Sequence, residues 1–353
     1  MTIDVRSRLL SGSLLVTAAL MATALVLPTG FAVRGPGPTE DTLGSQGDVP
    51  LVEISGAETF PPSGELRLTT VSVGGGPVGD VFALDVLRAW LSPQRGVLPV
   101  EAVFPVGQTR EEQQELSQQQ MLSSQERATA AALSELGIEV PATLTVAGVP
   151  EGSPSSGIAQ DGDVLRTLDG AGLTTYKDLL DGLTAITPGD DAVLGVVRDG
   201  ERLDLTVTTG EGTTPDGGRR AALGILVASD YHFPIDVEIQ IENIGGPSAG
   251  MMFALAIIDR LTPEDELNGE VVAGTGTIDV DGRVGAIGGI EQKLHGALRD
   301  GADWFLAPSS NCDEVVGNVP DGLRVVKVST LGEALDAIVA IGADDADGLP
   351  TCS

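Results

Sequence analysis

The spacing of hydrophobic and polar residues predicts a mixed α+β protein. Residues 66–73 alternate and are rich in threonine and valine, which predicts a β-strand. Residues 81–90 have apolar positions at helical spacing. Residues 111–136 are polar and rich in glutamine and alanine, which predicts a long helix closed by Gly137. The same reasoning predicts strands over residues 193–197, 221–227, 235–244, 270–280, 304–307 and 323–328, and a last helix over residues 330–341.

The N-terminal segment is strongly apolar. Arg6 and Arg8 precede residues 9–33, which contain no charged residue and exceed the ~20 residues that span a bilayer. We therefore expect residues 1–34 to be a transmembrane anchor, with a cleaved signal peptide as the alternative. The flanking arginines favour a cytoplasmic N-terminus and an extracytoplasmic body on the cell membrane. Residues 35–50, which are rich in glycine and proline, are expected to form a flexible linker.

Charge and composition exclude several classes of function. The chain has 51 acidic and 20 basic residues, a net charge of −31, which argues against nucleic-acid binding. It has two histidines, too few for a histidine-rich metal site, so we expect no metal and no cofactor. Cys312 and Cys352 lack the C-x-x-C spacing of a redox or zinc site. They could form a disulfide in an exported chain or remain free thiols.

One serine lies among small and turn-forming residues. Ser248 follows Gly246 and Pro247 and precedes Ala249, and the apolar run of residues 251–258 comes next. Proline favours the first turn of a helix, so Ser248 is expected near a helix N-terminus, where free N–H groups stabilise developing negative charge. The N–H groups near residues 246–249 are therefore candidates for an oxyanion hole. A serine needs an activating partner to act as a nucleophile.

Lys293 is the candidate partner. Ile290, Leu294, Ala297 and Leu298 form the apolar stripe of a short helix, and Lys293 lies at the edge of that stripe. Loss of hydration would lower the pKa of its amine and make it a general base. The alternative is a lysine that only covers apolar surface.

Two histidine arrangements compete with this lysine. His232 with Asp230 or Asp236 could instead serve Ser248 in a triad. His295 falls on the polar side of the helix that carries Lys293, away from the apolar stripe.

Three motifs resemble the proteolytic domain of the Lon proteases. They are Gly246-Pro247-Ser248-Ala249-Gly250, Gly274-Thr275-Gly276-Thr277-Ile278 and residues 285–293 (GAIGGIEQK), in the family's order and spacing. The resemblance implies a Lon-type domain over residues 218–342, with Ser248 as nucleophile, Lys293 as general base and Thr275 orienting the lysine. It also implies a possible hexameric ring. Gly245 departs from the pattern, because many Lon proteases have an aspartate there.

Residues 136–210 resemble a PDZ domain. The likeness rests on residues 152–158 (GSPSSGI), 161–165 (DGDVL) and 168–170 (LDG), and on the hairpin turn Asp199-Gly200. PDZ domains bind an extended peptide as an added strand, and Leu136, Gly137 and Ile138 are the candidate loop for its carboxylate. A helix cap at Gly137 is the alternative. Residues 211–220 then form a linker and residues 343–353 a polar tail.

Residues 68–73 (LTTVSV) resemble the opening strand of the YlbL-type relatives of Lon, which are anchored and carry a PDZ domain between two parts of the protease region. In that arrangement residues 51–135 pack with the protease domain. No G-x-x-x-x-G-K-[ST] loop occurs, so the chain lacks the ATPase motif of full-length Lon. These resemblances imply an ATP-independent serine endopeptidase that acts on exported or membrane-associated proteins. A non-catalytic PDZ scaffold and a dedicated processing protease for one partner are the alternatives.

Overall fold

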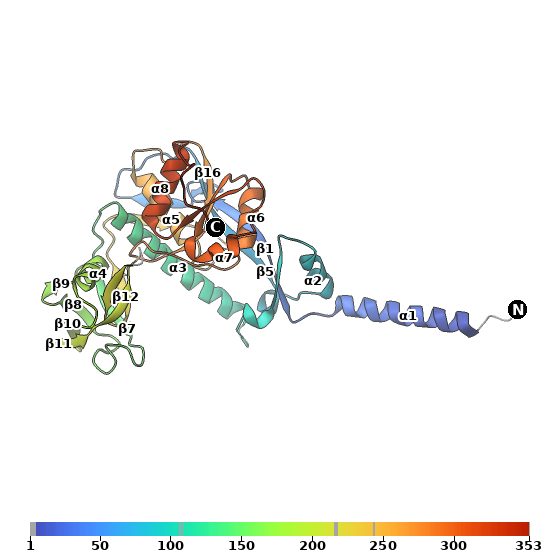
Figure 1. Cartoon of the computed structure of the whole chain (residues 1–353), viewed down its shortest axis with the longest axis horizontal. Coiled ribbons are helices and arrows are strands. Elements are labelled where there is room, and N and C mark those ends of the chain that lie inside the picture. Colours follow the sequence, from blue (N-terminus) through green and yellow to red (C-terminus); the bar gives the residue numbers. More distant parts are fainter. Residues whose placement is uncertain (1–4, 106, 108, 215–217, 243, 353) are drawn as a thin grey trace.

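A six-stranded mixed sheet forms the centre of the larger part of the protein (Figure 1). The computed structural model describes residues 5–105, 107, 109–214, 218–242 and 244–352. Neighbouring strands of this sheet follow one another in the order β20 (Arg324–Val328), β19 (Trp304–Pro308), β16 (Val271–Gly274), β5 (Glu65–Gly74), β1 (Phe31–Asp41) and β6 (Gly96–Pro99). The first four are parallel, and β1 runs antiparallel to both β5 and β6.

Helices cover both faces of this sheet, because alternate strand residues point to opposite sides. Trp304 and Leu306 of β19 belong to the core with α5 (Gly250–Leu261), α8 (Leu331–Gly342) and the end of α3 (Arg110–Glu135). Phe305 and Ala307 belong to the core with α6 (Ile290–Arg299). Helix α5 is buried from Gly250 to Asp259, as expected for a run that is apolar on every side.

A second sheet forms a separate module, drawn at the lower left of Figure 1. Its strands follow the order β11 (Glu201–Thr208), β10 (Asp191–Arg198), β8 (Val164–Leu168), β7 (Ala142–Gly148) and β14 (Leu226–Tyr231), and β9 (Ala171–Gly172) pairs with β8. Helix α4 (Tyr176–Ala185) packs on it through Leu179 and Leu183. The module therefore has a core of its own, and β14 is an edge strand.

The remaining elements are short. Paired strands are β4 (Val52–Ser55) with β15 (Asp236–Ile239), β17 (Thr277–Ile278) with β18 (Val284–Gly285), β12 (Gly210–Thr213) with β13 (Arg219–Ala222), and β2 (Ser45–Gln46) with β3 (Val49–Pro50). Helices are α1 (Val5–Val26), α2 (Ala83–Trp90), α7 (Cys312–Val315), η1 (Gly76–Val78), η2 (Val100–Ala102) and η3 (Ser309–Asn311). The hairpin β12–β13 occupies the expected linker of residues 211–220, of which 215–217 lie outside the described residues.

The N-terminal region differs from the expected anchor and linker. Helix α1 ends at Val26, and the segment after it forms β1, in the middle of the sheet between β5 and β6. Its glycines and prolines suggested a flexible linker, but strand pairing orders them, and the pairing register shifts between Pro36 and Thr39. Residues 1–4 of the expected anchor lie outside the described residues. Among the helices that the structure describes, none combines the length and the apolarity needed to cross a membrane.

Two predicted strands are each divided in the structure. The predicted strand over residues 270–280 becomes β16 and β17, with the turn Thr275–Gly276 between them. The predicted strand over residues 221–227 becomes the end of β13 and the start of β14, divided at Gly224, whose φ is +68°. In the C-terminal tail, whose residue 353 lies outside the described residues, a disulfide joins Cys352 to Cys312.

Candidate active site

Ser248 lies in the turn that leads into α5. Gly246 has a φ of +87°, which glycine adopts without strain, and its N–H donates to the carbonyl of Ser117 on α3 at 3.0 Å. The hydroxyl of Ser124, also on α3, donates to the carbonyl of Pro247 at 3.1 Å. The carbonyl of Ser248 itself accepts from the N–H of Gly276 at 2.9 Å. Contacts on both sides therefore hold the serine backbone in place.

The absence of a side chain at position 245 has a structural reason. A Cβ built on Gly245 would lie 2.8 Å from the Cβ of Ser117 and 3.3 Å from its carbonyl oxygen. The aspartate that many Lon proteases carry at this position would require α3 to move. Glycine here therefore fits the close packing of α3 on the serine turn.

The side chain of Lys293 points from α6 to the serine. Its Nζ donates to Ser248 Oγ at 2.8 Å and to Thr275 Oγ1 at 2.7 Å. The hydroxyl of Thr275 donates in turn to the Ser248 carbonyl at 2.9 Å. The structure thus brings together three residues that the sequence analysis had singled out on three separate elements.

Burial changes the chemistry of this lysine. The side chain of Lys293 is buried, and loss of hydration lowers its pKa from 10.5 to about 7. Within the described part of the chain, no carboxylate forms an ion pair with it. A substantial fraction of the amine is therefore neutral near pH 7, and a neutral amine can accept the serine proton.

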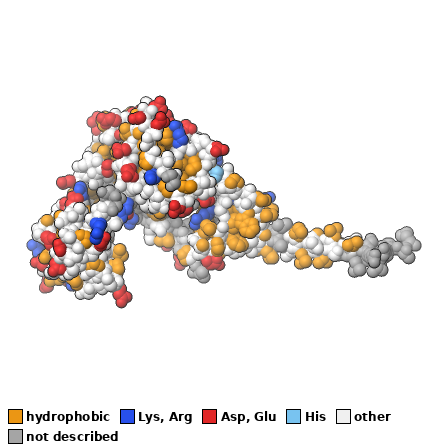
Figure 2. Space-filling view, viewed as in Figure 1, with side chains coloured by type: hydrophobic (Ala, Val, Ile, Leu, Met, Phe, Trp, Pro, Cys, Tyr) orange, Lys and Arg blue, Asp and Glu red, His pale blue; other side chains and the backbone are white. Residues whose placement is uncertain are grey.

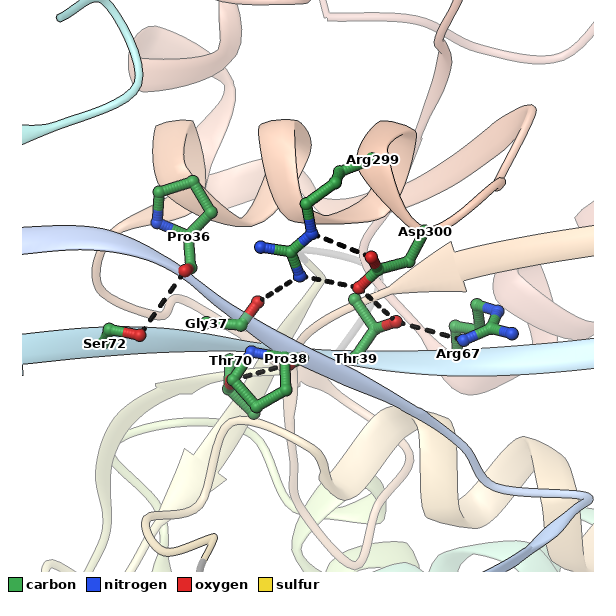
Figure 3. A network of polar contacts seen from close by, with 9 residues as sticks. All are labelled: Pro36, Gly37, Pro38, Thr39, Arg67, Thr70, Ser72, Arg299 and Asp300. Atoms are coloured by element: carbon green, nitrogen blue, oxygen red, sulfur yellow. Dashed lines mark hydrogen bonds and ion pairs between the residues drawn. The ribbon is translucent and has the colours of Figure 1, made fainter.

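The helix that carries Lys293 is attached to β1 at its C-terminal end (Figure 3). Arg299 donates to the carbonyl of Gly37 at 2.8 Å and pairs with Asp300 at 2.7 Å. Asp300 accepts from Thr39 at 2.9 Å, and Arg67 of β5 donates to the same threonine at 3.2 Å. These contacts fix α6 against the bulge of β1, and so set the position from which Lys293 reaches the serine.

A cleft of about 670 Å³ opens beside the serine. It is lined by β5 around Val71, by the serine turn from Ile244 to Ala249, and by residues 286–288. Among the described residues of this lining, Lys293 alone is charged. The cleft can therefore take an uncharged stretch of peptide next to the nucleophile.

Asn311 fixes one wall of the cleft, and sequence reasoning missed it. Its side chain is buried, and its Oδ1 accepts from the N–H of Ile287 while its Nδ2 donates to the carbonyl of Ile287, both at 2.9 Å. Cys312, the residue directly after Asn311, forms the disulfide with Cys352. No motif marks Asn311, because its partner is 24 residues away and is contacted through the backbone.

The predicted oxyanion donors need one revision. Pro247 has no N–H, and the N–H of Gly246 is already bonded to Ser117. Among the described residues, the N–H groups of Ser248 and Ala249 make no hydrogen bond, and both line or adjoin the cleft. They are therefore the remaining backbone candidates for stabilising an oxyanion.

The competing histidines are not in the cleft. His232 follows β14, and its N–H donates to the carbonyl of Pro141 in the module. His295 lies on α6, but neither histidine is among the residues that line the cleft around Ser248. The geometry therefore favours the lysine over a histidine as the partner of this serine.

The predicted carboxylate loop at residues 136–138 is a helix cap instead. Gly137 has a φ of +72°, its N–H donates to Ser134 and that of Ile138 donates to Leu133. This is the Schellman pattern, which satisfies the last carbonyls of α3. Because both N–H groups are occupied, they are not free to bind a carboxylate.

A second Leu-Gly-Ile triplet offers the unoccupied N–H groups that the first triplet does not. Leu223, Gly224 and Ile225 form the turn before the edge strand β14, and the Leu223 carbonyl accepts from Ser155 at 2.6 Å. Among the described residues, the N–H groups of Gly224 and Ile225 make no hydrogen bond. Repetition of the triplet was the signal that could have identified this turn.

Comparison with known proteins matches the part of the chain that carries Ser248, Thr275 and Lys293. Residues 232–341 match the family described as the Lon protease (S16) C-terminal proteolytic domain. A Lon protease of Brucella suis is 40% identical over 93 residues, which cover 26% of this chain and 11% of that protein. Lon protease 1 of Bacillus subtilis is 32% identical over 117 residues, 31% of this chain and 15% of that protein. The chain thus spans about a tenth to a fifth of the length of the curated relatives it matches.

Among solved structures, the PDZ domain of the SdrC-like protein of Listeria innocua is similar. It is 20% identical, with a TM-score of 0.22, and the match covers 26% of this chain and 99% of that domain.

Proposed function

We propose that this protein is a serine endopeptidase that uses Ser248 as nucleophile and Lys293 as general base, and that works without ATP. The observation that carries the proposal is the 2.8 Å contact between Lys293 Nζ and Ser248 Oγ, made by a buried amine whose pKa is about 7. The match of the surrounding residues to Lon proteolytic domains supports it. Independence from ATP is proposed because no phosphate-binding loop motif occurs in the sequence.

The proposed reaction follows from these contacts. The neutral amine of Lys293 takes the proton from Ser248 Oγ as the oxygen attacks the scissile carbonyl carbon. The N–H groups of Ser248 and Ala249 stabilise the oxyanion that forms. The protonated lysine then gives its proton to the leaving amine, and an acyl-enzyme remains. Lys293 next takes a proton from water as the water oxygen attacks the ester carbonyl carbon. When the bond to Ser248 Oγ breaks, Lys293 returns that proton to Oγ, which releases the acid and restores the free serine.

Thr275 has a positioning role in this scheme. Its hydroxyl accepts from Lys293 and donates to the Ser248 carbonyl, so it links the base to the backbone of the nucleophile. In this position it restricts the lysine side chain to the rotamer that reaches Ser248. It makes no hydrogen bond to Ser248 Oγ, and its removal should weaken catalysis without abolishing it.

The module around β14 is proposed to recruit substrate chains. Edge strands accept an extended peptide as a further strand, and two free N–H groups at a turn can hold a terminal carboxylate. Gly224 and Ile225 supply those N–H groups directly before β14. Substrates with accessible C-termini are therefore the proposed ligands of this module.

We also propose that the enzyme works outside the cytoplasm on exported or membrane-associated proteins. The disulfide between Cys312 and Cys352 supports an oxidising compartment. Arg6 and Arg8 before an apolar segment favour an extracytoplasmic body attached to the cell membrane. Assembly into a ring remains a proposal that rests on resemblance to Lon proteases.

The test is cleavage of unfolded exported proteins by the purified full chain without nucleotide, with new termini mapped by mass spectrometry. Ser248→Ala and Lys293→Met should each abolish the new termini. The matched control is Lys177→Met, because Lys177 is exposed and pairs only with Asp181 on α4. Cleavage that survives in Ser248→Ala would reject the proposed nucleophile. No cleavage by the wild type, together with retention of protein partners on the module, would favour the scaffold.

Mapping of termini in cells distinguishes the remaining alternative. A general protease should produce new termini in many exported proteins, and a dedicated processing protease in one. Either pattern should disappear in the Ser248→Ala strain.

A further inference from the structure

The outer face of α2 is apolar, whereas the exposed face of a surface helix is ordinarily polar. Val86 and Ala89 point inward and are buried. Leu84, Leu87 and Leu91 lie on the opposite side at i, i+3 and i+7, and Trp90 beside them is 72% exposed. The helix therefore has a second apolar face that nothing in the described chain covers.

This face is continuous with α1. The N–H and hydroxyl of Thr29 both donate to the carbonyl of Val81 at 2.8 Å, and Pro28 pairs with Phe82. The end of α1 is thus fixed beside the start of α2, and Figure 2 shows apolar side chains on the extended N-terminal part and on the adjoining part of the body. Most of the large exposed apolar side chains of the described residues lie in these two helices and the segments next to them. They are Leu10, Leu14, Leu15, Val16, Leu20, Met21, Val26, Leu27, Phe31, Val78, Leu84, Leu87, Trp90 and Leu91.

The charge of this region is opposite to that of the chain. Residues 5–34 and 76–99 together contain five arginines and two acidic residues, a local charge of +3 in a chain of −31. In Figure 2 the acidic side chains lie mostly over the larger body and the module. An apolar face with a positive local charge is complementary to a lipid bilayer, whose acyl chains are apolar and whose headgroups can be anionic.

We propose that the outer face of α2, together with α1, lies on a lipid bilayer that contains anionic lipid. Trp90 and Leu91 enter the interfacial layer, where tryptophan is favoured, and Arg88 and Arg95 lie at the level of the phosphates. The side chain of Arg88 is 65% exposed, and its 3.9 Å ion pair with Asp85 on the same helix leaves it in contact with solvent. This contact goes beyond any anchoring by α1 and does not depend on the peptidase.

Lipid fits this face better than a second copy of the chain. The exposed side chains of α1 lie around its whole circumference, because Leu10, Leu15 and Val16 point in three different directions. A partner helix would cover one narrow stripe, whereas the surface of a bilayer covers a wider part of the circumference. A symmetric contact would also bring two positive faces together.

Trp90 provides a direct test in the full chain, because the protein has two tryptophans. Trp304 is buried in the sheet with the Arg324 guanidinium over its ring, so Trp304→Phe leaves Trp90 as the only reporter. Vesicles of phosphatidylcholine and phosphatidylglycerol should shift its emission to the blue, and brominated acyl chains should quench it. The matched control, Trp90→Phe, reports from Trp304 and should show neither change.

Three results would overturn the proposal. One is a chain that binds the vesicles while Trp90 emission remains unquenched, since α1 alone would then hold it. Another is absence of binding to the vesicles. The third is a blue shift that grows with protein concentration without lipid, which would identify a second copy as the occupant.

Substitutions on the outer face measure how much α2 contributes. Replacing both Leu87 and Leu91 by glutamate should weaken partitioning into these vesicles at least about tenfold, because each leucine loses its burial in lipid. Val339→Glu is the matched control, since Val339 is 46% exposed on α8. Equal partitioning of both variants would exclude the α2 contact. Cleavage activity is a separate readout, so failure here leaves the proposed peptidase untouched.

Discussion

Replacing Lys293 by methionine should abolish activity and, near neutral pH, stabilise the fold. Burial lowers the pKa of this lysine from 10.5 to about 7, a shift worth roughly 5 kcal/mol of disfavour for the charged form. The unfolded chain pays no such penalty, because its lysine is hydrated. A methionine of similar length removes the ionisable group and keeps most of the packing.

The sign of the pH dependence follows from proton counts. Between pH 7 and 10.5 the unfolded state binds more protons than the folded state, so wild-type stability rises with pH. Below pH 7 Lys293 is charged in both the folded and the unfolded state, so the folded state bears the full free-energy cost of burying the charged amine. Removal of the charge should therefore raise the free energy of unfolding of Lys293→Met by roughly 4 kcal/mol at pH 7 and by roughly 2 kcal/mol at pH 9. Loss of the hydrogen bonds to Ser248 and Thr275 lowers it by about 2 kcal/mol at both pH values.

The assay is urea unfolding of the wild type and Lys293→Met at pH 7, 8 and 9, with Lys177→Met as control. The advantage of methionine over the wild type should fall by roughly 2 kcal/mol across this range, and Lys177→Met should show no such trend. In parallel, wild-type kcat/KM should rise through pH 7 as the amine deprotonates. A stability difference independent of pH, or a kcat/KM flat from pH 6 to 10, would refute a neutral lysine base.

Three further predictions test other parts of the structure. Thr275→Val should lower kcat about tenfold or more with little change in KM, measured by steady-state cleavage, because the lysine loses its positioning contact. Asn311→Ala should raise KM about tenfold with an unchanged pH profile, since the Ile287 wall is released; Asn318→Ala, at an exposed position, is the control. The two hydrogen bonds from Arg198 lower the pKa of the buried Asp163, so this pair should lose its stabilisation as pH falls through that lowered pKa. Asp163→Asn should cost about 3 kcal/mol at pH 7 in urea unfolding.

Local patterns were sufficient to single out Ser248 and Lys293, which the structure brings together beside the cleft. The small residues around Ser248 predicted an exposed nucleophile before a helix, and the stripe of α6 placed Lys293 at its apolar edge. Both are properties of neighbouring residues in the chain, and α5 and α6 have the predicted location. Long helices were also placed well, since α3 begins and ends within one residue of the predicted range.

Long-range contacts decided the rest. The glycine- and proline-rich segment after α1 became β1, an interior strand next to the edge of the sheet, because β5 and β6 supply its hydrogen-bond partners, and these lie far along the chain. The two Leu-Gly-Ile triplets have the same local preferences. Only their surroundings differ, since the carbonyls at the end of α3 occupy the N–H groups of Gly137 and Ile138, whereas no described residue accepts from those of Gly224 and Ile225.

The amino-acid sequence by itself determined which residues could react and on which elements they lie, because helical periodicity and turn chemistry are local properties. Tertiary structure decided that Lys293 Nζ lies 2.8 Å from Ser248 Oγ and loses its water. That distance depends on the packing of α3 on the serine turn and on the attachment of α6 to β1, which join residues more than 100 positions apart. Sequence spacing does not encode such distances, because they result from the packing of the whole core.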